Sequence, residues 1–285
     1  MVGRPFTVDG ASRTARSKIS EQHHMDGSNS WTMDLLPSLP KDNTSYNHEV
    51  GLYWLQQAEA EHASVASFAR HTLQLMSLGA PSELLIASQA ASIDEIKHAK
   101  MCYSLASIFI NTDVSPESLD VEESLGDLDV KSIIKSVIRE GCIEETLAAI
   151  EAHFRANHSE DLEIKQVLKE IAEDETKHAQ LAWDTIAWIS KQYPDYEKFI
   201  RNTFLENFEK QANILKDNEL EDSMNLCSEP QKNNYLNRFG ILIPEDQERV
   251  RNLGIEKIIK PAYADGFEEF HSISDNIKLF NADVI

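Results

Sequence analysis

The sequence carries the pattern Asp-Glu-x-x-His twice, as DEIKH at residues 94–98 and as DETKH at residues 174–178. Both copies lie inside long stretches that have the apolar periodicity of a helix. A glutamate and a histidine three positions apart lie one turn apart on the same helix face. Each copy therefore directs one oxygen ligand and one nitrogen ligand to the same side. Two such helices facing each other suit a pair of borderline metal ions such as iron or manganese.

Each copy is preceded by a predicted helix with a glutamate at a similar distance, Glu61 before the first copy and Glu145 before the second. Glu61 lies on the apolar face of its helix, where an unpaired carboxylate would be unfavourable by several kcal/mol. Metal binding would remove that cost. Four glutamates and two histidines in a two-fold repeat predict a dinuclear carboxylate site.

This two-fold pattern, which covers roughly residues 50–190, resembles the ferritin-like di-iron carboxylate proteins. That group includes the ribonucleotide reductase small subunit, soluble methane monooxygenase, rubrerythrin and p-aminobenzoate N-oxygenase. The resemblance implies an all-α fold, a ferritin-like four-helix bundle with one long crossover. It also implies two bound iron ions, or two manganese ions or a mixed pair. Glu61 and His98 would bind one ion and Glu145 and His178 the other. Glu95 and Glu175 would bridge both ions.

The resemblance also implies roles for residues beside the ligands. Asp94 and Asp174 directly precede the bridging glutamates, and each would accept a hydrogen bond from the histidine of the opposite helix pair, Asp94 from His178 and Asp174 from His98. Cys102 lies one turn beyond His98, where ribonucleotide reductase small subunits carry a radical-forming tyrosine. The cysteine argues against a reductase radical role, and a buried structural thiol is its commoner explanation.

The helical patterns divide the chain into three parts: an arm at 1–46, the four-helix bundle at 47–192 and a helical extension at 193–285 packed on the bundle. The arm is expected to be partly ordered against the body or against an oligomer partner, with a short strand and turn at 6–10. The bundle helices are predicted at 47–78, 82–110, 130–157 and from a cap at Ser159 to 192. The extension is predicted as a helix at 196–216, a polar loop at 217–234, and helices at 245–253 and 254–270.

The predicted connections agree with such a bundle. Short links within the first and the second helix pair make each pair antiparallel. The segment 111–127 between the pairs is long enough to return along the whole length of a helix.

The third helix leaves a choice between Glu144 and Glu145 as the ligand. The helix face through Glu145 is otherwise apolar or small, which leaves room for a metal ion. The face through Glu144 also contains Glu151, a second charge with no obvious partner in the sequence. This comparison of the two helix faces favours Glu145 as the ligand.

Composition excludes several classes of partner. A net charge of −21 argues against binding to nucleic acid or to an anionic membrane. The chain has no apolar run long enough to span a membrane, and residues 1–6 lack the apolar core of a signal peptide, so a soluble cytoplasmic protein is expected. Three dispersed cysteines provide neither a disulfide framework nor a rubredoxin-type iron site.

The leading functional hypothesis is a non-haem di-iron oxidase or monooxygenase that activates O2 to oxidise a small organic substrate, with an external electron donor. Iron handling or peroxide detoxification, as in ferritins and rubrerythrins, is the second hypothesis, and a non-catalytic bundle with metal as a folding staple is the third. A homodimer is compatible with the extensions at both ends. The sequence leaves open the substrate, the choice of metal and the electron donor.

Overall fold

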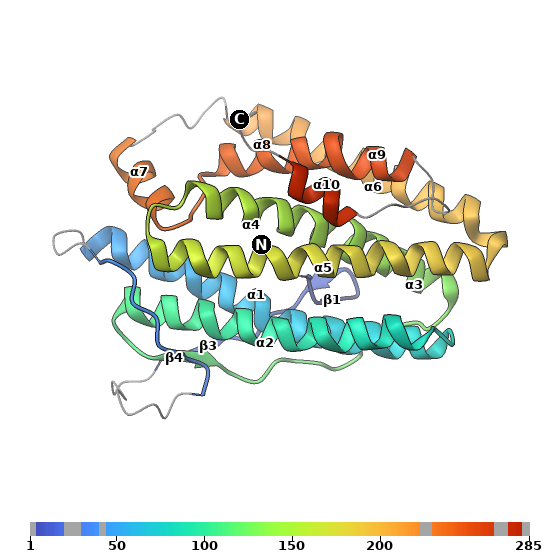
Figure 1. Ribbon diagram of the computed structural model, residues 1–285, viewed down its shortest axis with the longest axis horizontal. Helices are drawn as coiled ribbons and strands as arrows, with labels where there is room; N and C mark the ends of the chain where they lie inside the picture. Colours follow the sequence, from blue (N-terminus) through green and yellow to red (C-terminus); the bar gives the residue numbers. More distant parts are fainter. Residues whose placement is uncertain (1–3, 20–29, 40–43, 223–229, 265–272, 281–285) are drawn as a thin grey trace.

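The computed structural model describes residues 4–19, 30–39, 44–222, 230–264 and 273–280, and within these residues the fold is all-α with a few short strands. Figure 1 shows long helices running along the same axis, with shorter helices of the C-terminal part laid over one side. The predicted all-α class is confirmed.

The first helix pair consists of α1 (Thr44–Ser77) and α2 (Ser82–Ile110). The short link between them turns at Gly79, whose φ of 70° favours glycine because the residue has no Cβ. Pro81 then occupies the N-cap of α2 in an extended conformation. The tight link makes α1 and α2 antiparallel, as the sequence predicted.

The second pair consists of a three-part rod, α3 (Val130–Ser136), η1 (Val137–Glu145) and α4 (Thr146–His158), and of α5 (Leu162–Gln192). The rod was predicted as one uniform helix, but η1 is π-helical. The predicted cap of α5 was wrong. Asp161, not Ser159, caps this helix, because the Asp161 carboxylate accepts hydrogen bonds from the backbone N–H groups of Glu163 and Ile164 at 3.1 and 3.0 Å. Ser159 instead donates to the carbonyl of Arg238 at 3.0 Å.

The connection between the pairs runs back along the length of the helices, so that α2 and the α3–η1–α4 rod point the same way (Figure 1). It contains β4 (Val114–Pro116), which pairs antiparallel with β3 (Ser17–Ile19) of the N-terminal arm. The arm and the connection thus hold each other against the body.

The N-terminal arm begins with a hairpin of β1 (Thr7–Val8) and β2 (Ala11–Ser12). Asp9 and Gly10 form its turn, both with positive φ, which matches the right-handed twist of two paired strands. The hairpin is fastened to α1, since Arg70 donates to the carbonyl of Thr7 at 2.5 Å. The described part of the arm therefore lies on the body of its own chain.

The C-terminal part contains short and long helices: η2 (Pro194–Tyr196), α6 (Glu197–Asp222), α7 (Pro230–Arg238), α8 (Pro244–Gly254), η3 (Ile255–Ile259), α9 (Lys260–Ala264) and α10 (Ile273–Leu279). The predicted loop at 217–234 was wrong at both ends, because α6 extends into it and α7 begins inside it. Tyr235 of α7 is buried and donates a hydrogen bond to Asn47 of α1, a tertiary contact that local polarity did not reveal. Residues 223–229 and the end of the helix predicted at 254–270 lie outside the described residues.

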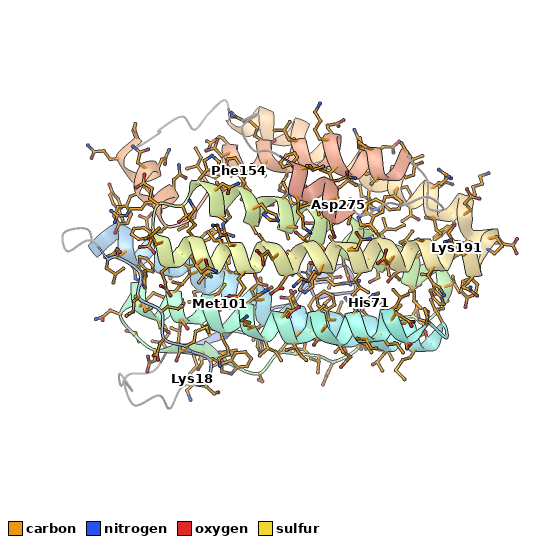
Figure 2. All side chains as sticks on the ribbon, viewed as in Figure 1. Lys18, His71, Met101, Phe154, Lys191 and Asp275 are labelled. Atoms are coloured by element: carbon orange, nitrogen blue, oxygen red, sulfur yellow. The ribbon has the colours of Figure 1, made fainter. Side chains whose placement is uncertain are left out.

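Most of the buried apolar side chains form two large clusters. One cluster joins the second helix pair to the C-terminal helices, and the other joins α1 and α2 to α4, α5 and α7. Side chains fill the space between the helices, where Met101 and His71 are buried (Figure 2). None of the described helices is both long enough and apolar enough to span a membrane.

Candidate metal centre

Six buried side chains meet between the two helix pairs, and they are the six that the sequence singled out. Each helix of the body contributes: α1 provides Glu61, α2 provides Glu95 and His98, η1 provides Glu145, and α5 provides Glu175 and His178. The four carboxylates and His98 are 0% exposed and His178 is 2% exposed. The structure therefore brings together residues that are far apart in the sequence.

The six side chains form two overlapping groups. One contains Glu61, Glu95, His98 and Glu175, and the other contains Glu95, Glu145, Glu175 and His178; within each group the ligand atoms lie within 4.8 Å of one another. Glu95 and Glu175 belong to both groups. This sharing is the arrangement in which two carboxylates bridge two ions.

Each histidine directs Nδ1 to the carboxylates. The Nδ1 of His98 lies 3.9 Å from Glu61 and 3.6 Å from Glu175. The Nδ1 of His178 lies 3.9 Å from Glu145 and 3.3 Å from Glu95. The two histidine rings are 6.0 Å apart between centroids, so the two groups sit side by side.

The Nε2 atom of each histidine faces an aspartate from the opposite helix pair. Asp174 lies 3.3 Å from Nε2 of His98, and Asp94 lies 3.4 Å from Nε2 of His178. These are the pairs that the resemblance implied. A carboxylate at Nε2 fixes the ring orientation and leaves the Nδ1 lone pair free for a cation.

The polar atoms that face the centre have no hydrogen-bond partner among the described residues. All eight oxygens of the four glutamates, and Nδ1 of both histidines, are buried without a hydrogen bond: Glu61, Glu95, Glu145, Glu175, His98 and His178. Unpaired buried carboxylates are strongly unfavourable. A pair of divalent cations would satisfy these atoms and offset four negative charges, so the donor set fits a dinuclear metal centre.

Burial and neighbouring charges shift the pKa values of several groups in this cluster. Burial and the charges of Glu95 and Glu175 raise the pKa of Glu61 well above its ordinary value, and burial with the charge of Glu175 does the same to Glu145. Burial disfavours the charge on His178, but its contacts with Asp94 and Glu175 prevail and raise its pKa. Burial opposes the ionisation of Asp174, yet hydrogen bonds from His98 and Lys177 hold its pKa below the usual range. A metal ion bound here would displace any protons that these groups hold.

The structure places Glu145 at the centre and Glu144 outside it. Glu144 forms an ion pair with Arg251 of α8 at 2.7 Å and remains partly exposed. Glu151 also pairs with Arg251, at 2.6 Å. The premise that Glu151 lacks a partner was thus wrong, because its partner comes from the C-terminal helices and is remote in sequence.

Replacement of Glu145 by alanine should therefore reduce metal content more than replacement of Glu144. We expect Glu145→Ala to lower the affinity for at least one ion by about a hundredfold, since even a residue that only supports a ligand contributes 10–100-fold. Elemental analysis of both purified variants, each dialysed against the same metal buffer, makes the comparison. The matched substitution Glu144→Ala should keep the full metal content and lose only stability from the Arg251 pair. The opposite ranking would reverse the assignment on η1.

The π-helical segment sets the position of Glu145. Gly141 lies within it, and a Cβ at this position would come within 2.4 Å of the Cβ of Ala182 on α5. The glycine therefore permits η1 to approach α5 closely, which brings Glu145 next to Glu175 and His178. A π-helical turn inserted in an α-helix is frequent at functional sites, but the sequence pattern did not indicate it.

Two features beside the centre were not identified from the sequence as neighbours of the site. The ring of Phe68 packs edge-on against His178 with centroids 5.0 Å apart, and the guanidinium of Arg4 lies over the ring of Phe68, 5.3 Å from its centroid. Phe68 belongs to the apolar face predicted for the first helix, so its burial could be anticipated. The position of Arg4 could not, because it depends on how the arm folds back.

Cys102 is buried and free, and burial raises the pKa of its thiol to about 12. It is not a member of either ligand group among the described residues. Its neutral thiol packs in the apolar cluster around α1 and α2.

No family model, no curated protein and no solved structure matches the chain.

Proposed function

We propose that the protein is a non-haem dinuclear metal oxidoreductase, an oxidase or monooxygenase that uses O2 to oxidise a small organic substrate, built on a ferritin-like four-helix bundle. One observation carries the proposal. Ten polar atoms of six buried side chains converge without hydrogen-bond partners, in two groups that share two carboxylates. A solvated charged helix face would not leave these atoms buried and unpaired.

The fold supports the ferritin-like part of the proposal. Two antiparallel helix pairs are joined by a connection that runs the length of the helices. Each pair contributes one lone glutamate and one Glu-x-x-His set, which is the ligand scheme of that superfamily.

The chain's own residues have distinct tasks in this proposal. Glu61 and His98 would hold one ion, Glu145 and His178 would hold the other, and Glu95 and Glu175, which belong to both groups, would be shared between them. Four carboxylates offset the charge of two divalent ions, which permits the centre to lie in a dry interior. Asp94 and Asp174 keep each imidazole oriented with Nδ1 toward the centre.

A bound pair of iron or manganese ions would supply redox chemistry toward O2 that side chains lack. Carboxylates suit such a pair because they can shift between bridging and terminal binding as the metal charge changes. Electrons would come from an external donor, and we propose a small molecule as the substrate.

The test measures metal stoichiometry and O2 uptake on the same preparation. Protein loaded with iron(II) without air should hold two ions per chain and should consume O2 repeatedly when a chemical reductant is supplied. A parallel sample loaded with manganese(II) shows which of the two metals supports O2 uptake. The Glu173→Ala variant, which changes an exposed position on α5, is the control: it should bind metal and consume O2 like the wild type.

The outcomes separate the functional classes. Two ions with sustained O2 uptake support the oxidoreductase. Uptake of many irons per chain, with O2 used only while iron is added, would indicate iron storage. Two firmly held ions that never react with O2 or peroxide would indicate a structural staple and would reject the proposal.

A further inference from the structure

Arg4, in the N-terminal arm, is a buried cation without hydrogen bonds from its side chain. Its side chain is 1% exposed, and none of its three guanidinium nitrogens has a hydrogen-bond partner among the described residues. The backbone holds it in place, because the carbonyl of Arg4 accepts a hydrogen bond from the hydroxyl of Ser64 on α1 at 2.7 Å. A charge buried in this way is unfavourable for the stability of the fold.

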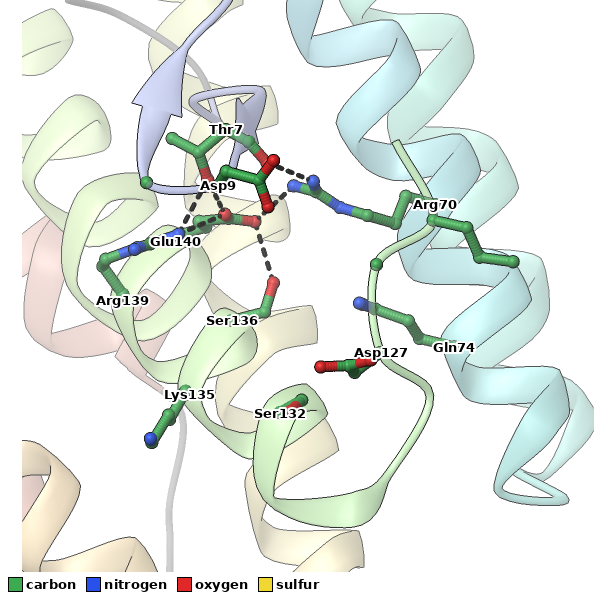
Figure 3. Close-up of a pocket in the computed structure, with 13 residues that line it drawn as sticks. Thr7, Asp9, Arg70, Gln74, Asp127, Ser132, Lys135, Ser136, Arg139 and Glu140 are labelled. Carbon is green, nitrogen blue, oxygen red and sulfur yellow. Dashed lines mark hydrogen bonds and ion pairs between the residues drawn. The ribbon is translucent and has the colours of Figure 1, made fainter. Parts of the chain in front are cut away.

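The carboxylate beside Arg4 does not neutralise it. Glu140 accepts a hydrogen bond from Arg70 at 2.8 Å (Figure 3). Ser136 and Arg139 also donate to this carboxylate, each at 2.9 Å. The Nε of Arg4 lies 3.9 Å from the Glu140 Oε2 atom, which is too far for a hydrogen bond. Because Arg70 is itself only 7% exposed, one buried carboxylate faces two buried guanidinium groups, and one positive charge is in excess.

Solvent does not screen this excess charge. A polar cavity of about 310 Å³ borders Glu140, but Arg4 is not among the residues that line it (Figure 3). Burial lowers the pKa of Arg4 from its ordinary value, and the charges of Glu140 and Glu145 oppose this effect. An arginine nevertheless keeps its proton at neutral pH. Arg4 is therefore a permanent positive charge in the interior.

Two contacts connect this charge with the metal centre. The guanidinium of Arg4 lies 5.3 Å from the centroid of the Phe68 ring, and the centroid of the same ring lies 5.0 Å from that of His178. On the other side, Nη1 of Arg4 lies 3.8 Å from the point that a Cβ on Gly141 would occupy, one helical turn before Glu145 in η1. The charge is thus no more than roughly 10 Å from the His178 ring.

A positive charge at this distance acts in opposite ways on the empty and on the loaded centre. In the empty centre it attracts the four buried carboxylates and stabilises their ionised form. In the loaded centre it repels the bound cations, and oxidation of those ions would increase the repulsion. Two unit charges roughly 10 Å apart in a partly shielded interior can change an equilibrium constant about tenfold.

We propose that the Arg4 cation weakens metal binding at Glu145 and His178 and raises the reduction potential of the bound pair. The N-terminal arm thereby contributes a residue that tunes the centre without being a ligand. A higher potential favours the reduced ions, which are the form that O2 would oxidise. The inference rests on the proposed metal centre, but its effect on metal affinity does not depend on O2 chemistry.

The test compares the manganese(II) affinity of the full-length wild type, Arg4→Met and Glu140→Gln, measured after metal removal by competition with a chelator. Methionine can pack on Phe68 without a charge, so Arg4→Met should bind manganese(II) about tenfold more tightly than the wild type. Glu140→Gln removes the negative charge beside Arg4 and should weaken binding about tenfold. A purely structural role predicts weaker binding in both variants, because both would loosen the packing of the arm.

The reduction potential of the iron-loaded protein, measured by redox titration, should follow the same signs. A tenfold change corresponds to about 59 mV for one electron. Arg4→Met should therefore lower the potential by about that amount, and Glu140→Gln should raise it. Arg16→Met removes the same charge from an exposed position of the same arm, and it should change metal affinity less than about twofold because solvent screens it.

Unchanged or weaker manganese(II) binding in folded Arg4→Met would overturn the role of Arg4, and so would an equal gain in Arg16→Met. If Arg4→Met does not fold, Glu140→Gln decides alone, and unchanged or tighter binding in that variant would overturn the inference. A wild type that binds two ions and reacts with O2, with variants that do not differ from it, would keep the proposed oxidoreductase and reject this role. The expected shifts in a protein that never reacts with O2 would do the reverse.

Discussion

Replacing Glu95 or Glu175 by alanine should abolish binding of the metal pair, with the affinity for both ions lowered by more than about a hundredfold. Each of these glutamates belongs to both ligand groups, so one substitution removes an oxygen from each ion. Loss of Glu61 or Glu145 removes ligands from one group only. The two shared positions should therefore show the largest effect of any single substitution. Elemental analysis after dialysis against a metal buffer, with a competing chelator to obtain affinities, makes the measurement.

Two further variants separate ligand loss from damage to the fold. Glu175→Gln preserves the shape of the side chain while removing its charge, and it should lose the metal pair nearly as completely as Glu175→Ala. Glu173→Ala, on the exposed side of the same helix, should bind metal normally. Circular dichroism confirms that each variant is folded. Two ions retained in both Glu95→Ala and Glu175→Ala would remove the basis of the dinuclear assignment.

The gain in stability that the metals provide should grow as pH rises above about 5, because the metal-free protein loses stability there through its buried glutamates. Glu61 and Glu145 have folded-state pKa values above their ordinary value of 4.5, because burial and neighbouring carboxylates disfavour their charge. The folded chain therefore holds these protons more tightly than the unfolded chain. Their stabilising contribution is complete below the ordinary pKa and is lost as pH rises through the folded-state pKa.

His178 acts in the same direction at higher pH. Its folded-state pKa is raised above 6.5, so its contribution is present below that value and is lost above the folded-state pKa. Asp174 and Glu175 have lowered pKa values and act in the opposite direction, but only at pH values below their ordinary pKa. Burial lowers the pKa values of His62, His71 and His153, which act in the opposite direction below 6.5, but these histidines lie outside the metal centre and should contribute equally with and without metals.

Thermal melting with and without metals, at several pH values, measures this effect. At neutral pH we expect the metals to raise the melting temperature by about 10 °C, since ligand at a thousandfold excess over its dissociation constant adds about 4 kcal/mol. The gain should shrink at pH 5. In the metal-free state, a Glu61→Gln variant should show a weaker pH dependence than the wild type, because one titrating group is gone. A gain from the metals that does not grow with pH would contradict the raised pKa values of Glu61 and Glu145.

The sequence alone identified the long helices and the six residues of the candidate centre. Helices of this length carry several turns of apolar periodicity, and a ligand pair such as Glu95 and His98 depends on helix geometry within a single segment. The placement of Glu61 and Glu145 followed from which helix face is apolar. These features are local, and local spacing is visible in a sequence.

Only the tertiary structure decided features that depend on segments far apart in the chain. Arg251 of α8 pairs with Glu144 and Glu151, which leaves Glu145 to the centre, and no pattern within η1 indicates that pairing. The close approach of η1 to α5 depends on Gly141 meeting Ala182. Arg4 reaches Glu140 because the N-terminal hairpin folds onto α1. Periodicity reports which side of one helix is apolar, whereas charge pairing across the interior is settled only when the helices pack.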